Sequence, residues 1–217
     1  ESEPAPPLGG AFPYGGREMN TIRRTLVAFL AITATVMMAL PAAGADWNVD
    51  TSHSSVTFEV KHLAISKVKG AFGEFSGTVT GEADKPETLA VEVEIQVASV
   101  NTGNEKRDDH LRNPDFFDVD KFPTMTFKST GVKMNGDEGV LTGDLTLHGV
   151  TKSIELELEY AGMITDPWGN TRMGFSAEGE IDRTEFGLTW SKAMETGGLV
   201  VANEVEIELE IELVMAK

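Results

Sequence analysis

The sequence predicts an all-β protein, an antiparallel β-barrel of about eight strands with one short helix at a barrel mouth. Three observations predict this fold. Apolar and polar residues alternate along most of the chain, clusters of Gly, Asn, Asp and Pro separate the alternating segments, and only one stretch has a helical pattern. Each strand then has one apolar face, and a sheet that closes into a barrel hides these faces and leaves no exposed edge.

The first 45 residues are expected to lie outside the folded domain. Residues 19–45 have the features of a secretory signal peptide: two arginines, an apolar run at residues 26–40 and a small-residue cleavage pattern. The run has fifteen residues, fewer than the roughly 20 that a membrane-spanning helix needs. Residues 1–18 precede the methionine of the signal and are rich in Pro and Gly, so we expect them to be a non-native upstream segment. Residues 46–217 then form a single domain.

The charge and the cysteine count exclude several classes of function. The formal charge is −17, and it remains −17 without residues 1–45 because these hold three acids and three arginines. Such a field repels nucleic acid and anionic membranes, so neither nucleic-acid binding nor stable membrane insertion is expected. The chain has no cysteine, which excludes disulfides, thiol catalysis and the lipid-bearing cysteine of a lipoprotein. A free, exported protein is the prediction.

The strand pattern is clearest at the end of the chain, where five glutamates alternate with Val, Ile and Leu. A period of two is that of a half-buried strand, whereas a helix would set glutamate beside glutamate at i, i+4. Strands are expected at residues 54–60, 70–81, 89–97, 124–134, 139–148, 153–160, 172–182 and 204–216. Turn signals at residues 135–137 and 166–170 predict hairpins.

The alternation alone leaves a β-sandwich open. An outer-membrane barrel also alternates, but it needs aromatic girdles and a polar lumen. Aromatic residues make up only 7% of this chain, and five glutamates from one strand would repel one another in a lumen. We therefore expect the apolar faces to point inward.

Residues 101–118, "NTGNEKRDDHLRNPDFFD", contain the predicted helix of about two turns. Candidate N-caps are Asn101, Thr102 and Asn104. Glu105 suits the positive helix start, and Asn113, which precedes a proline, closes the helix. Asp108 and Arg112 are expected to pair at i, i+4. Two phenylalanines follow the helix, which suits a lid over one mouth of the barrel.

No motif in the sequence indicates catalysis or metal binding. Asp108, Asp109 and His110 are consecutive on the helix, so their side chains diverge by about 100° and cannot converge on one ion. We interpret them as part of a solvated, internally paired helix, with an inward polar cluster of Arg107 and His110 as the alternative. The other histidines are His53, His62 and His148, each alone among predicted strand residues. No ligand spacing, nucleophile elbow, P-loop or Rossmann pattern occurs, so no catalytic residue, metal or cofactor is predicted, although the histidines could still meet in space.

Long stretches of the chain resemble a known family. They begin with "DWNVDTSHSSVTFEVKHLAISKVKGAFGEFSG" at residue 46 and continue with "ASVNTGNEKRDDHLRNPDFFDVDKFPTMTFKST", "LTGDLTLHGVTKSIELEL", "DPWGNTRMGFSAEGEIDRTEFGLTW" and "GGLVVANEVEIELEIEL". This sequence resembles the YceI-like family, bacterial periplasmic polyisoprenoid-binding proteins, over essentially all of residues 46–217. The resemblance implies a lipocalin-like antiparallel barrel in the periplasm. It also implies a ligand inside the barrel: a polyisoprenoid, an isoprenoid quinone or another long-chain lipid.

With that ligand, a role can be expected for fourteen residues. The wall is expected to include Phe58, Val60, Phe72, Phe75, Phe127, Phe175 and Trp190. The mouth is expected to include Leu111, Phe116 and Phe117, and the polar head group is expected near His62, Asn101, Arg107 and His110. A barrel of this size is either filled by its own side chains or holds one slender ligand. Two alternatives stay open: an enzyme acting on such a lipid through Asp108, Asp109 and His110, and a ligand-free stress-related protein with a packed barrel. A homodimer is also left open.

Overall fold

The computed structural model describes residues 45–82, 84–193 and 197–217. The predicted upstream segment and signal peptide lie outside these residues, except for Ala45. Two features of the described part matter for function: a closed barrel, and the elements that cover its ends.

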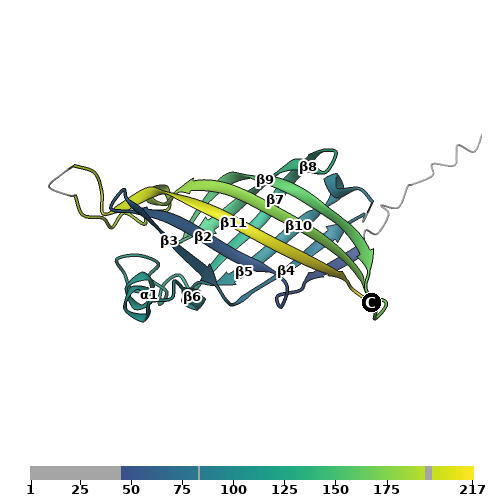
Figure 1. The fold of residues 1–217 in the computed structure, drawn as a ribbon, viewed down its shortest axis with the longest axis horizontal. Coiled ribbons are helices and arrows are strands. Elements are labelled where there is room, and N and C mark those ends of the chain that lie inside the picture. The colour runs from purple at the N-terminus through teal and green to yellow at the C-terminus, as the bar shows by residue number, and fades with distance from the viewer. Residues whose placement is uncertain (1–44, 83, 194–196) are drawn as a thin grey trace, which may run out of the picture. The chain divides into compact units, whose positions relative to one another are not determined.

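Within the described residues, eleven strands form one antiparallel sheet (Figure 1). They are β1 (Ala45–Val49), β2 (Ser55–His62), β3 (Ser66–Phe72), β4 (Phe75–Gly81), β5 (Ala90–Gln96), β6 (Val100–Asn101), β7 (Thr124–Asn135), β8 (Glu138–Leu147), β9 (Val150–Thr165), β10 (Thr171–Asp182) and β11 (Val201–Met215). The order β1-β4-β5-β7-β8-β9-β10-β11 closes on itself because β1 pairs with both β4 and β11. The predicted antiparallel barrel of about eight strands is confirmed.

The remaining strands extend this barrel at one end. β2 pairs with the first two thirds of β11, β3 pairs with β2, and the two-residue β6 pairs with β3. The single strand predicted at residues 70–81 is wrong. The chain leaves β3 at Phe72 and starts β4 at Phe75, because Gly73 turns away and donates its N–H to the Ser99 carbonyl at 3.4 Å.

The predicted helix is confirmed, but its predicted ion pair is wrong. Helix α1 (Glu105–Arg112) begins after Asn104, whose side chain accepts the Arg107 N–H at 3.1 Å. The Asp108 carboxylate is buried and accepts the Thr102 N–H at 2.9 Å, so it does not reach Arg112. Arg112 instead pairs with Asp109 at 3.1 Å. The helix therefore uses Asp108 to hold the chain that enters it.

The two ends of the barrel are covered differently. The α1 end contains α1, the 3-10 helix η3 (Arg183–Phe186), the β2–β3 turn and residues 197–200, which lead into β11 (Figure 1). The opposite end contains β1, the 3-10 helix η1 (Pro86–Thr88) and the β9–β10 turn, with the C-terminus beside it. We call this the β1 end. A buried cluster closes it around the completely buried Trp47, together with Val79, Met173 and Leu213.

Candidate functional site

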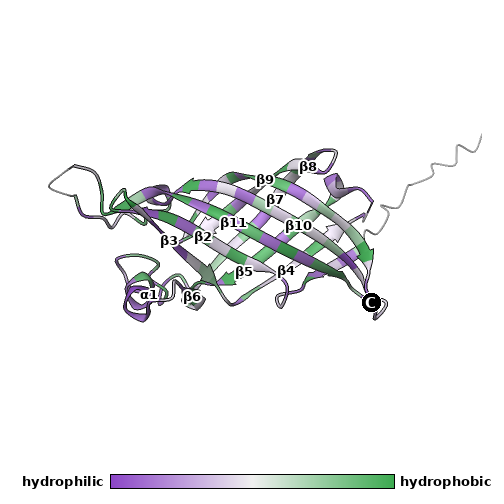
Figure 2. Ribbon diagram, in the orientation of Figure 1, coloured by the Kyte–Doolittle hydropathy of each residue, from purple (hydrophilic) through white to green (hydrophobic). Residues whose placement is uncertain are grey.

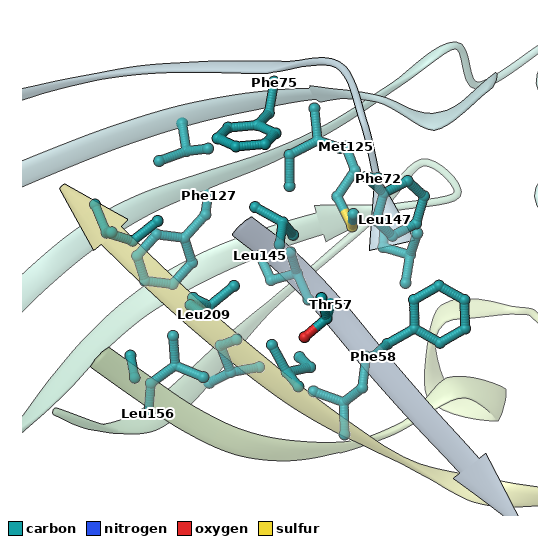
Figure 3. A pocket seen from close by; sticks show the side chains of 18 of the residues that line it. Thr57, Phe58, Phe72, Phe75, Met125, Phe127, Leu145, Leu147, Leu156 and Leu209 are labelled. Carbon is teal, nitrogen blue, oxygen red and sulfur yellow. The ribbon is translucent and has the colours of Figure 1, made fainter. Parts of the chain in front are cut away.

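An elongated apolar cavity of about 240 Å³ runs inside the barrel. Every one of the eight barrel strands contributes side chains to it, and Leu111 of α1 and Pro86 of η1 contribute from the two ends. Among the lining residues only Thr57 and Arg183 have polar side chains. Figure 3 shows side chains of β2, β7, β8 and β11 converging on this shared space. A ligand in this cavity would meet almost nothing but hydrocarbon.

Inward-facing residues of β11 show that the middle of the barrel is hollow. Ile207, Leu209 and Ile211 all line the cavity and stay only half-buried. Leu213 faces inward on the same strand but is 1% exposed, because it packs in the cluster that closes the β1 end. The glutamates between them point outward, and Figure 2 shows this alternation along the ribbon. The half-buried surface therefore belongs to the interior of the barrel.

Glycines allow aromatic rings to lie flat against the wall. Gly70 of β3 pairs with Phe58 of β2, and a Cβ atom at Gly70 would collide with the Phe58 ring. A Cβ atom at Gly143 of β8 would likewise collide with the ring of Phe127 on the neighbouring strand β7. A strand glycine commonly marks such a close approach. The rings occupy the space that the missing side chains leave, and the lumen between them stays open.

An aromatic chain links the wall to the segment after α1. The ring centroids of Phe58 and Phe72 are 5.6 Å apart, and those of Phe72 and Phe117 are 5.8 Å apart. Such spacings are typical of stabilising aromatic pairs. The α1 segment is thus held against the barrel by the same rings that line the cavity.

The structure brings nine of the fourteen predicted site residues to the cavity. These are Phe58, Val60, Phe72, Phe75, Leu111, Phe116, Phe117, Phe127 and Phe175. The other five are not among its lining residues. They are His62, Asn101, Arg107, His110 and Trp190.

Those five residues build the outer side of the α1 end instead. His110, Phe116 and Trp190 form a cluster of three rings with centroids 5.0 Å apart, which ties α1 to the chain after η3. Arg107 donates to the hydroxyl and carbonyl oxygens of Thr102, at 2.6 and 2.9 Å. The side chain of Asn101 accepts the Gly103 N–H, and His62 ends β2 opposite Ser66. Arg107 and His110, the alternative inward cluster, are thus not among the residues that line the cavity.

The cation at the cavity is Arg183, which the sequence reasoning missed. Its side chain is 5% exposed, and it donates to the main-chain carbonyls of Ala202 at 2.8 Å, Val201 at 3.4 Å and Leu188. Burial lowers the pKa of the guanidinium below its usual value, although the charge of Asp182 opposes this effect. Arg183 thus ties the start of β11 to Leu188, which follows η3, and places a poorly solvated positive charge at the α1 end of the cavity.

The histidines do not meet. His53 lies in the turn after β1, where its ring is 3.0 Å from Asp50, and His148 lies in the β8–β9 turn against Phe122. Their predicted places in strands are wrong because both occur where the chain turns. Among the described residues, Asp50, His53 and Glu212 form a group whose potential ligand atoms lie within 4.8 Å of one another.

The Arg172 side chain already binds the two carboxylates of that group. Its guanidinium donates to Asp166 at 2.7 Å, to Asp50 at 2.8 Å and to Glu212. The pKa of Asp50 is lowered by hydrogen bonds from Ser52 and then from Arg172, and that of Asp166 is lowered chiefly by Arg172. These contacts join β1, the β9–β10 turn and β11, so the cluster is a structural tie at the β1 end.

The sequence and the fold agree with those of known proteins. Residues 47–213 match the model of the YceI-like domain. The chain belongs to the YceI-like family. Protein YceI of Salmonella newport (strain SL254) is 38% identical over 200 residues, which cover 91% of this chain and 98% of the relative. Protein YceI of Shigella flexneri is 42% identical over 161 residues, which cover 73% of this chain and 84% of the relative.

Solved YceI-like structures have the same barrel. The Campylobacter jejuni YceI protein superposes with a TM-score of 0.64 at 34% identity, covering 72% of this chain and 90% of that one. A polyisoprenoid binding domain from Saccharophagus degradans superposes with a TM-score of 0.59 at 17% identity, covering 78% and 98%. At that identity the likeness concerns the fold alone. Within the described part of this chain, no helical segment has the length and apolar character that crossing a bilayer requires.

Proposed function

We propose that this YceI-like protein is a periplasmic lipid carrier or storage protein, which holds an isoprenoid chain or a similar long-chain lipid inside its barrel. The observation that supports it is the apolar cavity whose inward side chains keep unfilled space around them. Transfer of a tail from water to this cavity gains about 25 cal/mol for each Å² of apolar surface removed from water. Costs of association and chain ordering reduce that gain. The Saccharophagus degradans domain of the same fold is a polyisoprenoid binding domain, which agrees with this choice of ligand.

The proposed pose has the tail along the barrel and the head group at the α1 end. Arg183 offers a cation there, whereas the β1 end is closed by apolar packing around Trp47. A desolvated guanidinium is a strong partner for phosphate or quinone oxygens. The head-group role expected for His62, Asn101, Arg107 and His110 stays a prediction, and their places outside the cavity favour Arg183 over them.

The enzyme alternative has little support at the cavity. Asp108 is engaged with Thr102, Asp109 is paired with Arg112, and neither they nor His110 are lining residues. The packed-barrel alternative conflicts with the half-buried inward residues. The homodimer and the periplasmic location remain predictions, the second because the signal peptide lies outside the described residues.

Native mass spectrometry of protein purified without detergent tests the proposal. We expect a bound prenyl lipid that organic extraction removes, and a melting temperature that falls on removal and recovers when geranylgeranyl phosphate is added. At a free ligand concentration of 100 times Kd, the recovery corresponds to about 2.7 kcal/mol. Bare protein that also takes up no added prenyl lipid would contradict the proposal.

A further inference from the structure

The turn between β2 and β3 exposes large apolar side chains at the α1 end. Ile65 is 86% exposed, and Leu63 is exposed beside it. Leu199, also exposed, lies next to them, because the Leu63 N–H donates to the carbonyl of the adjacent Val200 at 2.9 Å. We call Leu63, Ala64, Ile65 and Leu199 the apolar tip. Contact between water and a group of apolar side chains is energetically unfavourable, and such exposed patches often mark interaction sites.

The backbone of the apolar tip has an uncommon conformation. Leu63 and Ala64 have φ values of +53° and +59°, in the left-handed region that hairpin turns normally fill with Asn or Gly. Strained residues of this kind persist where the surroundings impose them, and they gather at functional sites. The Ile65 N–H is nevertheless satisfied, since it donates to the His62 carbonyl at 3.2 Å. The tip can therefore enter an apolar medium without stripping water from the N–H groups of Leu63 or Ile65.

The charge around the apolar tip differs from that of the rest of the protein. Between Glu59 and Glu74 the chain has three lysines and no acid. Lys67 and Lys69 form ion pairs with three acids, Glu59, Glu206 and Glu208. Lys61 is exposed one residue before the end of β2. The three lysines of this segment balance those three acids, so the tip can approach a lipid head-group layer without the excess negative charge of the rest of the protein.

A second exposed apolar turn provides a comparison. At the β1 end, Met163, Ile164 and Trp168 are exposed in and beside the β9–β10 turn, with Ile164 at 65%. Residues 160–172 contain one acid and one arginine, which pair with each other, and no lysine. Of these two turns, the β2–β3 turn alone combines exposed apolar residues with a nearby exposed lysine and closeness to the cavity, since Val60 and Val201 beside it are lining residues.

We propose that the apolar tip docks on the surface of a lipid bilayer, so that the α1 end of the cavity faces the source or destination of its ligand. This inference rests on the proposed lipid ligand. Docking is shallow and reversible, with Ile65 and Leu63 at the level of the acyl boundary and Lys61 among the phosphates. A soluble carrier gains from such contact, because a long prenyl tail then never has to cross open water.

Flotation with vesicles of phosphatidylcholine and a minor share of phosphatidylglycerol tests the docking. Burial of one exposed isoleucine changes a partition coefficient by a factor of about ten or more. We expect the wild-type protein to float with the vesicles and Ile65→Asp to lose at least about tenfold in binding. The matched control is Ile164→Asp, which makes the same change at the other exposed turn and should bind as the wild type does.

A parallel assay separates this inference from the proposed function. Both variants should bind geranylgeranyl phosphate, added without vesicles, as tightly as the wild type, because neither residue lines the cavity. Wild-type protein that binds this ligand but does not float, or an equal loss of flotation in both variants, overturns the docking and leaves the carrier proposal intact. A third outcome is a wild-type protein that does not float but forms a dimer, which Ile65→Asp abolishes. The tip would then bind a second copy of this chain, and the docking would also be overturned.

Discussion

The substitution Leu209→Trp tests directly whether the barrel is hollow. Leu209 lies at the middle of β11, lines the cavity and stays half-buried. In a packed interior, an added ring forces neighbouring side chains out of their rotamers and costs about 1–3 kcal/mol. In this barrel the ring has a 240 Å³ cavity beside it, so we expect the ligand-free variant to be as stable as the wild type or more stable.

The same indole must compete with the ligand for space. If it displaces about four carbon groups of a prenyl tail, at about 0.8 kcal/mol each, binding loses about 3 kcal/mol. That corresponds to a weakening of Kd by roughly a hundredfold or more. Urea unfolding of delipidated protein measures the stability, and titration with geranylgeranyl phosphate measures the affinity.

The control is Glu210→Trp, which places the same side chain one residue further along β11 on the outer face. It should leave the affinity for the ligand unchanged, because Glu210 is exposed and outside the cavity. A ligand-free Leu209→Trp protein destabilised by about 1–3 kcal/mol would mean that the barrel is already filled. Wild-type affinity in Leu209→Trp would mean that the tail does not reach this part of the barrel.

Three further substitutions test other parts of the structure. Arg183→Met should weaken binding of a prenyl phosphate about tenfold or more. A prenyl alcohol of equal chain length should bind the variant as tightly as it binds the wild type. An equal loss for both ligands would mean that Arg183 only stabilises the local structure. Arg172→Met should flatten the acid dependence of the melting temperature below about pH 4. The two aspartates it pairs with have lowered pKa values in the fold, so their contribution is present above the unfolded pKa and lost as the pH falls; an unchanged pH profile would contradict this. Gly143→Ala should lower the free energy of unfolding, measured in urea, by about 1–3 kcal/mol and weaken ligand binding. Gly131→Ala should have neither effect, because a Cβ there would meet no atom within 4 Å. Equal effects of the two substitutions would contradict the role given to Gly143.

The barrel could be predicted from the sequence because apolar and polar residues alternate visibly along its longer strands. In β11, β5 and β9 the alternation alone assigns an inward and an outward face to each residue, and the structure keeps that assignment. The short strand β1 was missed. Its five residues are too few for a periodic signal, and its place between β4 and β11 depends on the pairing of distant segments. Closure of the barrel was therefore expected from the need to hide apolar faces, while the strand that closes it was found only in the structure.

The polar part of the site was assigned poorly for a physical reason. Residues near the helix were expected to face the ligand because the helix was expected to cover a mouth. The turns of α1 instead direct Arg107 and Asp108 toward Thr102. Arg183 had a usable signal: it continues the inward parity of Phe175 and Ile181 beyond the end of β10. A charged residue at an inward position is rare enough to single out as a candidate.

The shape of the cavity restricts which ligands can bind more than the apolar character of its lining does. On β11 the lining runs from Val201 to Leu213, about 12 steps of about 3.3 Å, or roughly 40 Å of strand. With a strand tilt of about 40°, this is about 30 Å along the barrel axis. A volume of about 240 Å³ spread over that length leaves a narrow channel. A flexible unbranched or prenyl chain can follow such a channel and bury its whole length, whereas a compact hydrophobe of equal area would have to push apart rings that lie against Gly70 and Gly143. In the proposed function, selectivity for chains follows from the width that the glycines set, whereas the apolar lining supplies affinity that any hydrocarbon would share.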